Sequence, residues 1–396
     1  MPVAESLDAV VGRAVELRHQ LHQVPELGYE EHETAAIIRS ELDRLSLAWE
    51  HGPADAPTAT MTVIGDPAKP CIALRADIDA LPITERTGLP YASRHVGKMH
   101  ACGHDGHASV LLGVAAALAE RVEELPVCVK CFWQPAEEGG GGGKRLVDAG
   151  LLDGRWGPKV TAVYGLHGWP NLPVGMVSTR PGPLLAATDT FRITVKGVGC
   201  HGAFPHMGAD PVVTAAAIVQ DVQHIASRDF DPTEPVVVTV GKIHGGTANN
   251  VIPDEVTLEG TARTLTPEGR AQVEAALRRR SAAVAEAGRC TVDFAWKRGY
   301  PPTVNDPDEA ARVVKVVRET LGEGRFILAG RPAMGGEDFA FYVEQVPGCF
   351  FLVGTQPEGA EAYPPLHSDR YDFTDAAVAT GIRMMLGLVR SYACDT

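Results

Sequence analysis

The chain contains 396 residues, of which 45% are hydrophobic and 22% charged, and its formal net charge at pH 7 is −14. This length accommodates two domains, and the composition is typical of a globular protein. The negative charge argues against nucleic acid and anionic membrane surfaces as partners.

Other features of the sequence argue against a membrane protein or an exported one. No apolar run approaches the ~18 residues that a membrane helix needs. The N-terminal residues have neither the basic region nor the apolar core of a signal peptide. The eight cysteines are scattered along a long chain, which fits a reducing compartment. We therefore expect a cytoplasmic protein that binds neither membranes nor nucleic acid.

Helices and short buried strands alternate over the first half of the chain. Apolar residues at helical spacing predict helices at 8–23, 34–45, 108–122 and 144–152, and apolar runs predict strands at 71–74, 127–133 and 160–166. Polar residues, including Asp77, Glu137 and His167, follow these strands. Open α/β sheets bind their ligands beyond the carboxyl ends of strands, so the pattern indicates an α/β sheet enzyme.

The periodicity changes near residue 185. The predicted order is a strand at 188–196, a helix at 211–225, strands at 236–243 and 255–263, a helix at 267–285 and a strand at 290–296. This is the β-α-β-β-α-β order of ferredoxin-like domains. A strand at 349–353 and helices at 309–321 and 376–389 then complete the first domain. We therefore expect a discontinuous domain, 1–184 and 299–396, interrupted by an inserted domain at 185–298.

The stretch Met99–His107 concentrates a thiol, three imidazoles and a carboxylate in nine residues. Cys102 and His104 are two residues apart, so in an extended segment their side chains point the same way. A soft sulfur ligand beside an imidazole is typical of zinc or another divalent transition metal. His100, Asp105 and His107 are candidates to orient these ligands.

Three later positions supply what the stretch lacks. Hydrolysis at a metal needs one carboxylate to hold the metal and another to move the proton of the attacking water, and the adjacent pair Glu137–Glu138 can divide these tasks. His167 and His367 each follow a predicted strand. Together with Cys102, His104 and Glu138, these two histidines make five candidate ligands. Five ligands exceed what one tetrahedral zinc needs, and they suit two metals about 3.5–4 Å apart.

The inserted domain carries polar groups suited to a lid over such a site. They lie in His201–His206, in Gly245–Asn250 and at Arg263. Their donors can stabilise an oxyanion and hold a substrate carboxylate. By contrast, Cys128 and Cys131 are predicted to face opposite sides of a strand, which argues for structural cysteines. No serine-hydrolase elbow and no complete phosphate loop occur.

Motifs spread over almost the whole chain resemble those of the metal-dependent amidohydrolases. This family includes hippurate hydrolases, N-acyl-L-amino-acid amidohydrolases and auxin-conjugate hydrolases, within the clan of aminoacylase-1 and carboxypeptidase G-like peptidases. The resemblance rests on Leu21–Gly28, Leu74–Pro82, Met99–His107, Gln134–Glu138, Gly165–His167, His201–His206, Asn250–Asp254, Glu337–Phe339, His367 and Tyr371–Phe373.

The resemblance implies an α/β catalytic domain with a mixed sheet flanked by helices, and a ferredoxin-like insert that acts as lid and dimerisation domain. It implies hydrolysis of the amide bond of N-acyl-L-amino acids by a homodimer with two divalent ions (zinc, manganese, cobalt or nickel) per subunit. The residues it assigns are the metal ligands Cys102, His104, Glu138, His167 and His367, the general base Glu137, the oxyanion residue His201, and the substrate-binding residues His206, Asn250 and Arg263.

The sequence departs from the clan at a few positions. Arg75-Ala76-Asp77 stands where clan peptidases place a His-x-Asp metal motif, and the Cys102 thiolate takes over ligand duty, as in the amidohydrolase branch. Gly168 and Gly336 replace bulkier residues or serine, which alters pocket shape but leaves the ligand set intact.

Two other functions remain open on the same residues. One is a di-metal exopeptidase or dipeptidase, or an N-acyl-diaminopimelate deacylase, with the same core. The other is a non-catalytic binding protein, against which the complete ligand set and the intact Glu137 argue. The sequence does not fix the acyl group, the metal or whether His201 acts across a dimer interface.

Overall fold

The structure is a computed structural model that describes residues 6–394, and it divides the chain into two compact units. The prediction that the chain has no signal peptide rests on its first residues, and positions 1–5 lie outside the described range. The first unit comprises Met1–Leu184, Val304–Arg331 and Asp338–Thr396, and the second comprises Leu185–Thr303 and Pro332–Glu337. Within the described range, no helix combines the length and apolar character needed to cross a membrane.

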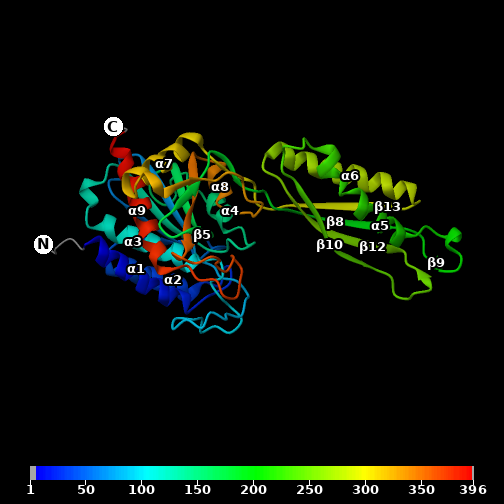
Figure 1. The fold of residues 1–396 in the computed structure, drawn as a ribbon, viewed down its shortest axis with the longest axis horizontal. Helices are drawn as coiled ribbons and strands as arrows, with labels where there is room; N and C mark the ends of the chain where they lie inside the picture. Colours follow the sequence, from blue (N-terminus) through cyan, green and yellow to red (C-terminus); the bar gives the residue numbers. More distant parts are fainter. Residues whose placement is uncertain (1–5, 395–396) are drawn as a thin grey trace. The chain divides into compact units, whose positions relative to one another are not determined.

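The first unit is built on one mixed sheet of eight strands (Figure 1). In spatial order the strands are β1 (Trp49–His51), β2 (Thr60–Ile64), β4 (Cys128–Gln134), β3 (Cys71–Asp77), β5 (Val160–Pro173), β16 (Gly348–Gln356), β6 (Val177–Thr179) and β15 (Phe326–Leu328). The central strands β4, β3, β5 and β16 run parallel. Their carboxyl ends therefore meet at one edge, where an open α/β sheet keeps its site.

Helices cover both faces of this sheet. Its helices are α1 (Leu7–His22), α2 (His32–Arg44), α3 (His104–Ala119), α4 (Gly142–Asp148), α7 (Pro307–Thr320), α8 (Ala340–Val343) and α9 (Asp375–Ser391). Successive residues of β4 show the two faces: the Trp133 indole donates to Ala108 O of α3 at 3.1 Å, whereas Phe132 packs against Tyr342 of α8. Every residue of β3 and β4 is accordingly buried, as expected for strands covered on both sides.

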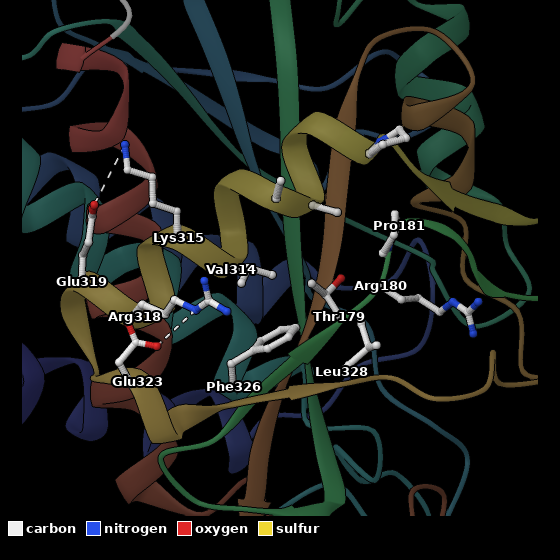
Figure 2. A pocket seen from close by; sticks show the side chains of 13 residues that line it. Thr179, Arg180, Pro181, Val314, Lys315, Arg318, Glu319, Glu323, Phe326 and Leu328 are labelled. Atoms are coloured by element: carbon white, nitrogen blue, oxygen red, sulfur yellow. Dashed lines mark ion pairs between the residues drawn. The ribbon is translucent and has the colours of Figure 1, made fainter.

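A hollow of about 480 Å³ lies beside α7, β6 and β15 (Figure 2). Val314, Phe326 and Leu328 give it apolar walls, and the ion pair Arg318–Glu323, 3.4 Å, lies at its margin. Because neither histidine nor cysteine lines this hollow, it does not contain the predicted metal site.

The second unit has the strand and helix order predicted for the insert. Its main elements are β8 (Asp189–Lys196), α5 (Pro211–Asp221), β10 (Val237–Gly245), β12 (Glu255–Arg263), α6 (Pro267–Ala287) and β13 (Thr291–Arg298). The antiparallel sheet has the order β10-β12-β8-β13. Burial alternates along β8, where Phe191, Ile193 and Val195 are buried in the core of this unit. A further pair, β9 (Cys200–His201) and β11 (Val251–Ile252), joins two of its loops.

Two short strands, β7 (Gly182–Leu185) and β14 (Thr303–Asn305), pair where the chain passes between the units. The fold class is therefore the predicted one: an α/β domain with a mixed sheet flanked by helices, and an inserted α+β domain with ferredoxin-like order.

Candidate metal centre

The first turn of α3 holds the predicted ligands in a conformation that the sequence did not suggest. Residues 101 and 102 form a turn, and Gly103, with φ +85°, caps the helix that begins at His104. The prediction of an extended segment through Cys102 and His104 is therefore wrong. The left-handed conformation favours glycine at 103, and it brings both side chains together although they do not lie on a strand.

Cys102, His104 and His167 form one cluster of possible ligands. One ligand atom of each lies within 4.8 Å of the others, and Cys102 Sγ is 3.4 Å from His167 Nε2. All three side chains are buried. His167 was predicted to end its strand, but it lies within β5. It is two residues beyond Gly165, the last residue of β5 that pairs with β3. Because β5 no longer pairs with β3 at His167, the imidazole can approach the start of α3.

Hydrogen bonds fix which nitrogen each ring offers. His167 Nδ1 donates to the carbonyl of Gly168 at 2.7 Å, and His104 Nδ1 donates to Asp79 Oδ1 at 3.2 Å. Both rings thus present Nε2 to the cluster, with the orienting contact that metal-binding histidines typically have. His104 Nε2 is buried and makes no hydrogen bond to any described residue. Asp77 Oδ2 lies 3.5 Å from it, and a cation would give this nitrogen a closer partner.

Glu138 and His367 form a second cluster that again includes Cys102. His367 Nε2 is 3.2 Å from Glu138 Oε1, and the backbone N–H of Glu138 donates to Asp79 Oδ2 at 2.9 Å. The His367 side chain is 53% exposed, so this cluster faces solvent, unlike the first. We call the two clusters the His104 site and the His367 site. Because Cys102 belongs to both, its sulfur would help to hold a cation at either cluster.

Glu137 completes the group. One of its oxygens lies within 4.8 Å of ligand atoms of His104 and Glu138. Its side chain is 6% exposed, and its Oε1 accepts the backbone N–H of Asp338 at 3.4 Å. Ala136, which precedes it, has φ +56°, a costly conformation for a residue with a side chain. This turn aims two adjacent carboxylates at one centre.

The protonation states of the ligands depend strongly on their surroundings. Burial would lower the pKa of His104, but the carboxylates of Asp77, Asp79 and Glu138 raise it to about 10. Burial and the same negative surroundings raise the pKa of Cys102 well above its usual range. Burial lowers the pKa of His167 to about 3. Without a metal, His104 is therefore cationic and Cys102 a thiol, and both must lose a proton to bind one.

His107 has no ring nitrogen left for a metal. Its Nδ1 donates to Asp77 Oδ1 at 2.5 Å, and its Nε2 accepts the backbone N–H of Gly168 at 2.9 Å. The ring ties α3 to β3 and β5, and the carbonyl of the same Gly168 accepts a hydrogen bond from His167 Nδ1.

Asp105 and His100, which were predicted to orient the ligands, are both buried. Asp105 Oδ2 accepts from His22 Nδ1 at 2.9 Å, and the charge of His22 lowers the pKa of Asp105, which burial alone would raise. His100 is 1% exposed, and burial lowers its pKa to about 3. Neither residue belongs to a ligand cluster found among the described residues.

A buried polar network under the centre was not assigned by the sequence reasoning. Arg75 donates to Asp77 Oδ2 at 2.7 Å, to Asp338 Oδ1 at 2.9 Å and to Gln134 Oε1 at 2.9 Å. Arg75 thereby holds Asp338, whose N–H contacts Glu137. Asp79 links His104 to Glu138. Charged residues at the end of a buried strand were the available signal, but their partners lie up to 263 positions away.

The residues predicted for the lid lie in the second unit. His201 in β9 is paired with Val251, and the N–H of Gly202 donates to Asn250 O at 2.7 Å. Phe204 contacts the rings of both His201 and His206. The side chains of His201, His206 and Asn250 are exposed. The structure thus brings these three into one loop cluster.

Arg263 lies apart from that cluster, at the end of β12. It is half-buried, and its Nη1 donates to Ala262 O at 3.1 Å and also contacts Thr261 Oγ1. Burial lowers its pKa.

Two clusters of His, Cys and Glu that share a thiolate, beside a spare buried carboxylate, fit two divalent cations and the chemistry of a metal-dependent hydrolase. Residues 73–391 match the family described as Peptidase family M20/M25/M40. The chain belongs to this family, and its resemblance to metal-dependent amidohydrolases is confirmed.

Relatives and solved structures agree over nearly the full length. N-acetyl-L-cysteine deacetylase of Bacillus subtilis is 40% identical over 370 residues, covering 92% of this chain and 85% of that protein. IAA-amino acid hydrolase ILR1-like 4 of Arabidopsis thaliana is 38% identical over 385 residues, covering 96% and 86%. The crystal structure of the Bacillus subtilis YXEP protein, a dinuclear metal binding peptidase from the M20 family, superposes with a TM-score of 0.85 and 34% identity, covering 98% and 99%.

Proposed function

We propose that the protein hydrolyses the amide bond of N-acyl-L-amino acids, with Cys102, His104, Glu138, His167 and His367 holding two divalent cations. The observation that carries this proposal is the convergence of four of these side chains around the buried thiol of the fifth, Cys102, with Glu137 close to His104 and Glu138. The names of the relatives support the substrate class, since deacetylases and conjugate hydrolases of amino acids recur among them.

Glu137 is the general base in this proposal. The cations would supply Lewis acidity for the amide carbonyl and the attacking water. Glu137 accepts the proton of that water and later gives it to the leaving amine. The Asp338 N–H restrains the Glu137 carboxylate. In this proposal Glu137 is not one of the five metal ligands, and its carboxylate transfers the proton.

The second unit contributes the lid in this proposal. His201 donates to the oxyanion, while His206, Asn250 and Arg263 bind the substrate carboxylate. The exposure of His201, His206 and Asn250 in one loop cluster supports this role, because such groups acquire binding energy when a ligand desolvates them. We also propose that 185–298 acts as a lid and dimerisation domain beside a catalytic domain of 1–184 and 299–396, and that the protein is a homodimer.

We infer a first-row divalent cation, of which zinc, manganese, cobalt and nickel all suit the donors. A cytoplasmic location is also proposed. The free cysteines found among the described residues support it, since thiols persist where the compartment is reducing.

A substrate panel on the metal-reconstituted protein tests the function. It should contain N-acetyl-, N-benzoyl- and indole-3-acetyl-amino acids, an N-acetyl-diaminopimelate and free dipeptides. We expect hydrolysis of the acylated compounds and little of the dipeptides. Preferential cleavage of dipeptides would replace this proposal with the exopeptidase alternative, and preference for the diaminopimelate conjugate would select the deacylase.

A further inference from the structure

His367 has a backbone conformation that the surrounding structure must impose. Its φ is +65°, in the left-handed region that costs a residue with a side chain about 1 kcal/mol or more. Its N–H donates to Ala101 O at 2.8 Å, next to Cys102. This backbone bond and the 3.2 Å contact of its ring with Glu138 Oε1 hold the residue itself, and the segment that follows is held separately.

The segment 371–373 packs directly on the start of α3. A Cβ placed on Gly103 would lie 3.0 Å from Phe373 and 3.2 Å from Tyr371, and a Cβ on Gly106 would lie 2.1 Å from Phe373. The absence of side chains at the two glycines therefore lets the aromatic rings reach the helix backbone. The segment that follows His367 therefore packs against the turn that follows Cys102.

Arg18 of α1 holds this piece from the interior. Its side chain is fully buried, and it donates to Asp372 Oδ1 at 2.7 Å and to Asp375 Oδ1 at 2.7 Å, with Asp105 Oδ2 at 3.4 Å. The Tyr91 hydroxyl donates to the other oxygen of Asp372 at 3.1 Å. Asp372 is thus anchored five residues after His367, by a cation that also contacts the residue after His104.

We propose that Arg18 and Asp372 are positioning residues for the metal centre, whose ion pair, between a buried guanidinium and a partly buried carboxylate, keeps His367 within reach of Glu138 and Cys102. The inference rests on the proposed function only in taking His367 as a ligand. Neither residue touches a ligand atom, so they act through segment 367–372 and its docking on α3. Residues that orient metal ligands in this way typically change metal affinity about 10- to 100-fold.

Metal titration of the full-length protein tests this proposal without any substrate. The metal-free wild type and the D372N variant are titrated with Co²⁺, followed by thiolate-to-metal absorption and by competition with a chelator. We expect two Co²⁺ ions per wild-type chain. In D372N we expect one of the two affinities to fall by about tenfold or more and the other to stay within about twofold, because His104 and His167 keep their own partners.

The matched control is D375N, which removes another partner of Arg18. Asp375 lies at the start of α9 and contacts Arg18 and His19, and it is eight residues from His367. We expect D375N to keep both Co²⁺ affinities. An equal loss of affinity in D375N and D372N would overturn the proposal, since the Arg18–Asp372 contact would then matter no more for His367 than another contact of Arg18 does.

The double variant R18M/D372N separates positioning from stability. D372N takes from the buried Arg18 guanidinium one of its three carboxylate partners, Asp105, Asp372 and Asp375. R18M then removes the guanidinium, and with it the cost of a buried cation that has lost part of its compensation. We expect thermal stability to recover relative to D372N while the weakened Co²⁺ affinity persists. Recovery of the affinity together with stability would contradict the proposal, as would a D372N variant that melts lower but binds both ions normally.

A wild type that binds fewer than two ions would overturn both this proposal and the proposed centre. Failure of the protein to cleave N-acyl amino acids would contradict the proposed function alone.

Discussion

Two histidines of the first unit, His104 and His167, are buried, whereas those of the predicted lid in the second unit are exposed. His367 of the first unit differs from both buried rings, since its side chain is 53% exposed. In the first unit, His104 and His167 are 0% and 8% exposed, and each has its Nδ1 committed to a fixed acceptor. In the second unit, His201 and His206 are exposed on a loop cluster. Buried, oriented rings are ready to bind a cation, whereas exposed rings gain function when a ligand or a partner surface covers them. The comparison predicts that metal binding belongs to the first unit and that the second unit affects substrate binding and turnover but not metal content.

Replacing Glu137 should give the largest effect. In Glu137→Gln we expect kcat to fall by about 10²–10⁴-fold, because the proton acceptor is lost, while the content of metal stays at two ions per chain. Steady-state kinetics and elemental analysis of the same preparation check this. Near-normal turnover would remove Glu137 from the role of general base.

Cys102 and His367 should differ in how much metal they hold. Because Cys102 lies in both ligand clusters and His367 in one, Cys102→Ala should lose both ions and His367→Ala only one. Elemental analysis after dialysis measures this directly. An unchanged stoichiometry in Cys102→Ala would exclude the thiolate from the ligand set.

Metal affinity should increase with pH. The pKa of His104 is raised to about 10 and that of Cys102 well above its usual range, so both bind protons in the metal-free protein at neutral pH. Each proton displaced by the metal makes the affinity increase by about tenfold per pH unit. Chelator competition with Zn²⁺ between pH 6 and pH 8.5 should show this slope, and a flat profile would contradict the assigned protonation states.

His201→Ala sharpens the comparison from the side of the second unit. We expect kcat to fall by about 10²-fold, the scale of losing one oxyanion donor, with metal content and melting temperature unchanged because the ring is exposed. Loss of metal in this variant would contradict the claim that metal binding belongs to the first unit alone.

The smallest effects concern packing. In Gly106→Ala the new Cβ would meet Phe373 at 2.1 Å, and we expect a loss of about 1–3 kcal/mol, the usual cost of overpacking. Gly241 in β10 of the second unit has no heavy atom within 4 Å of the same position. Gly241→Ala should therefore stay within about 0.5 kcal/mol. Urea unfolding of both variants gives the difference.

Local patterns predicted the elements that carry clear periodicity. The alternating burial of β8 and the apolar runs of β3 and β4 are where the sequence placed them. Short strands such as β6 and β15, three residues each, were missed because so few residues carry no period. They exist because neighbouring strands offer them hydrogen bonds.

The candidate site shows the same limit. Residue chemistry and the family resemblance selected Cys102, His104 and Glu138 although the local conformation of the first two was predicted wrongly. The residues that hold them could not be assigned, because the Arg75–Asp338 and Arg18–Asp372 contacts join positions 263 and 354 residues apart. Only the folded chain brings such charges together, and burial is what makes their pairing necessary.

The central claim is a two-cation centre in the first unit that hydrolyses N-acyl amino acids. Its most direct test is to titrate the metal-free protein with Zn²⁺ or Mn²⁺ and to measure bound metal and hydrolysis of an N-acetyl amino acid in the same samples. We predict that activity appears with metal and reaches its maximum at two ions per chain. Full activity in the presence of excess chelator, or saturation at a single ion, would contradict the account.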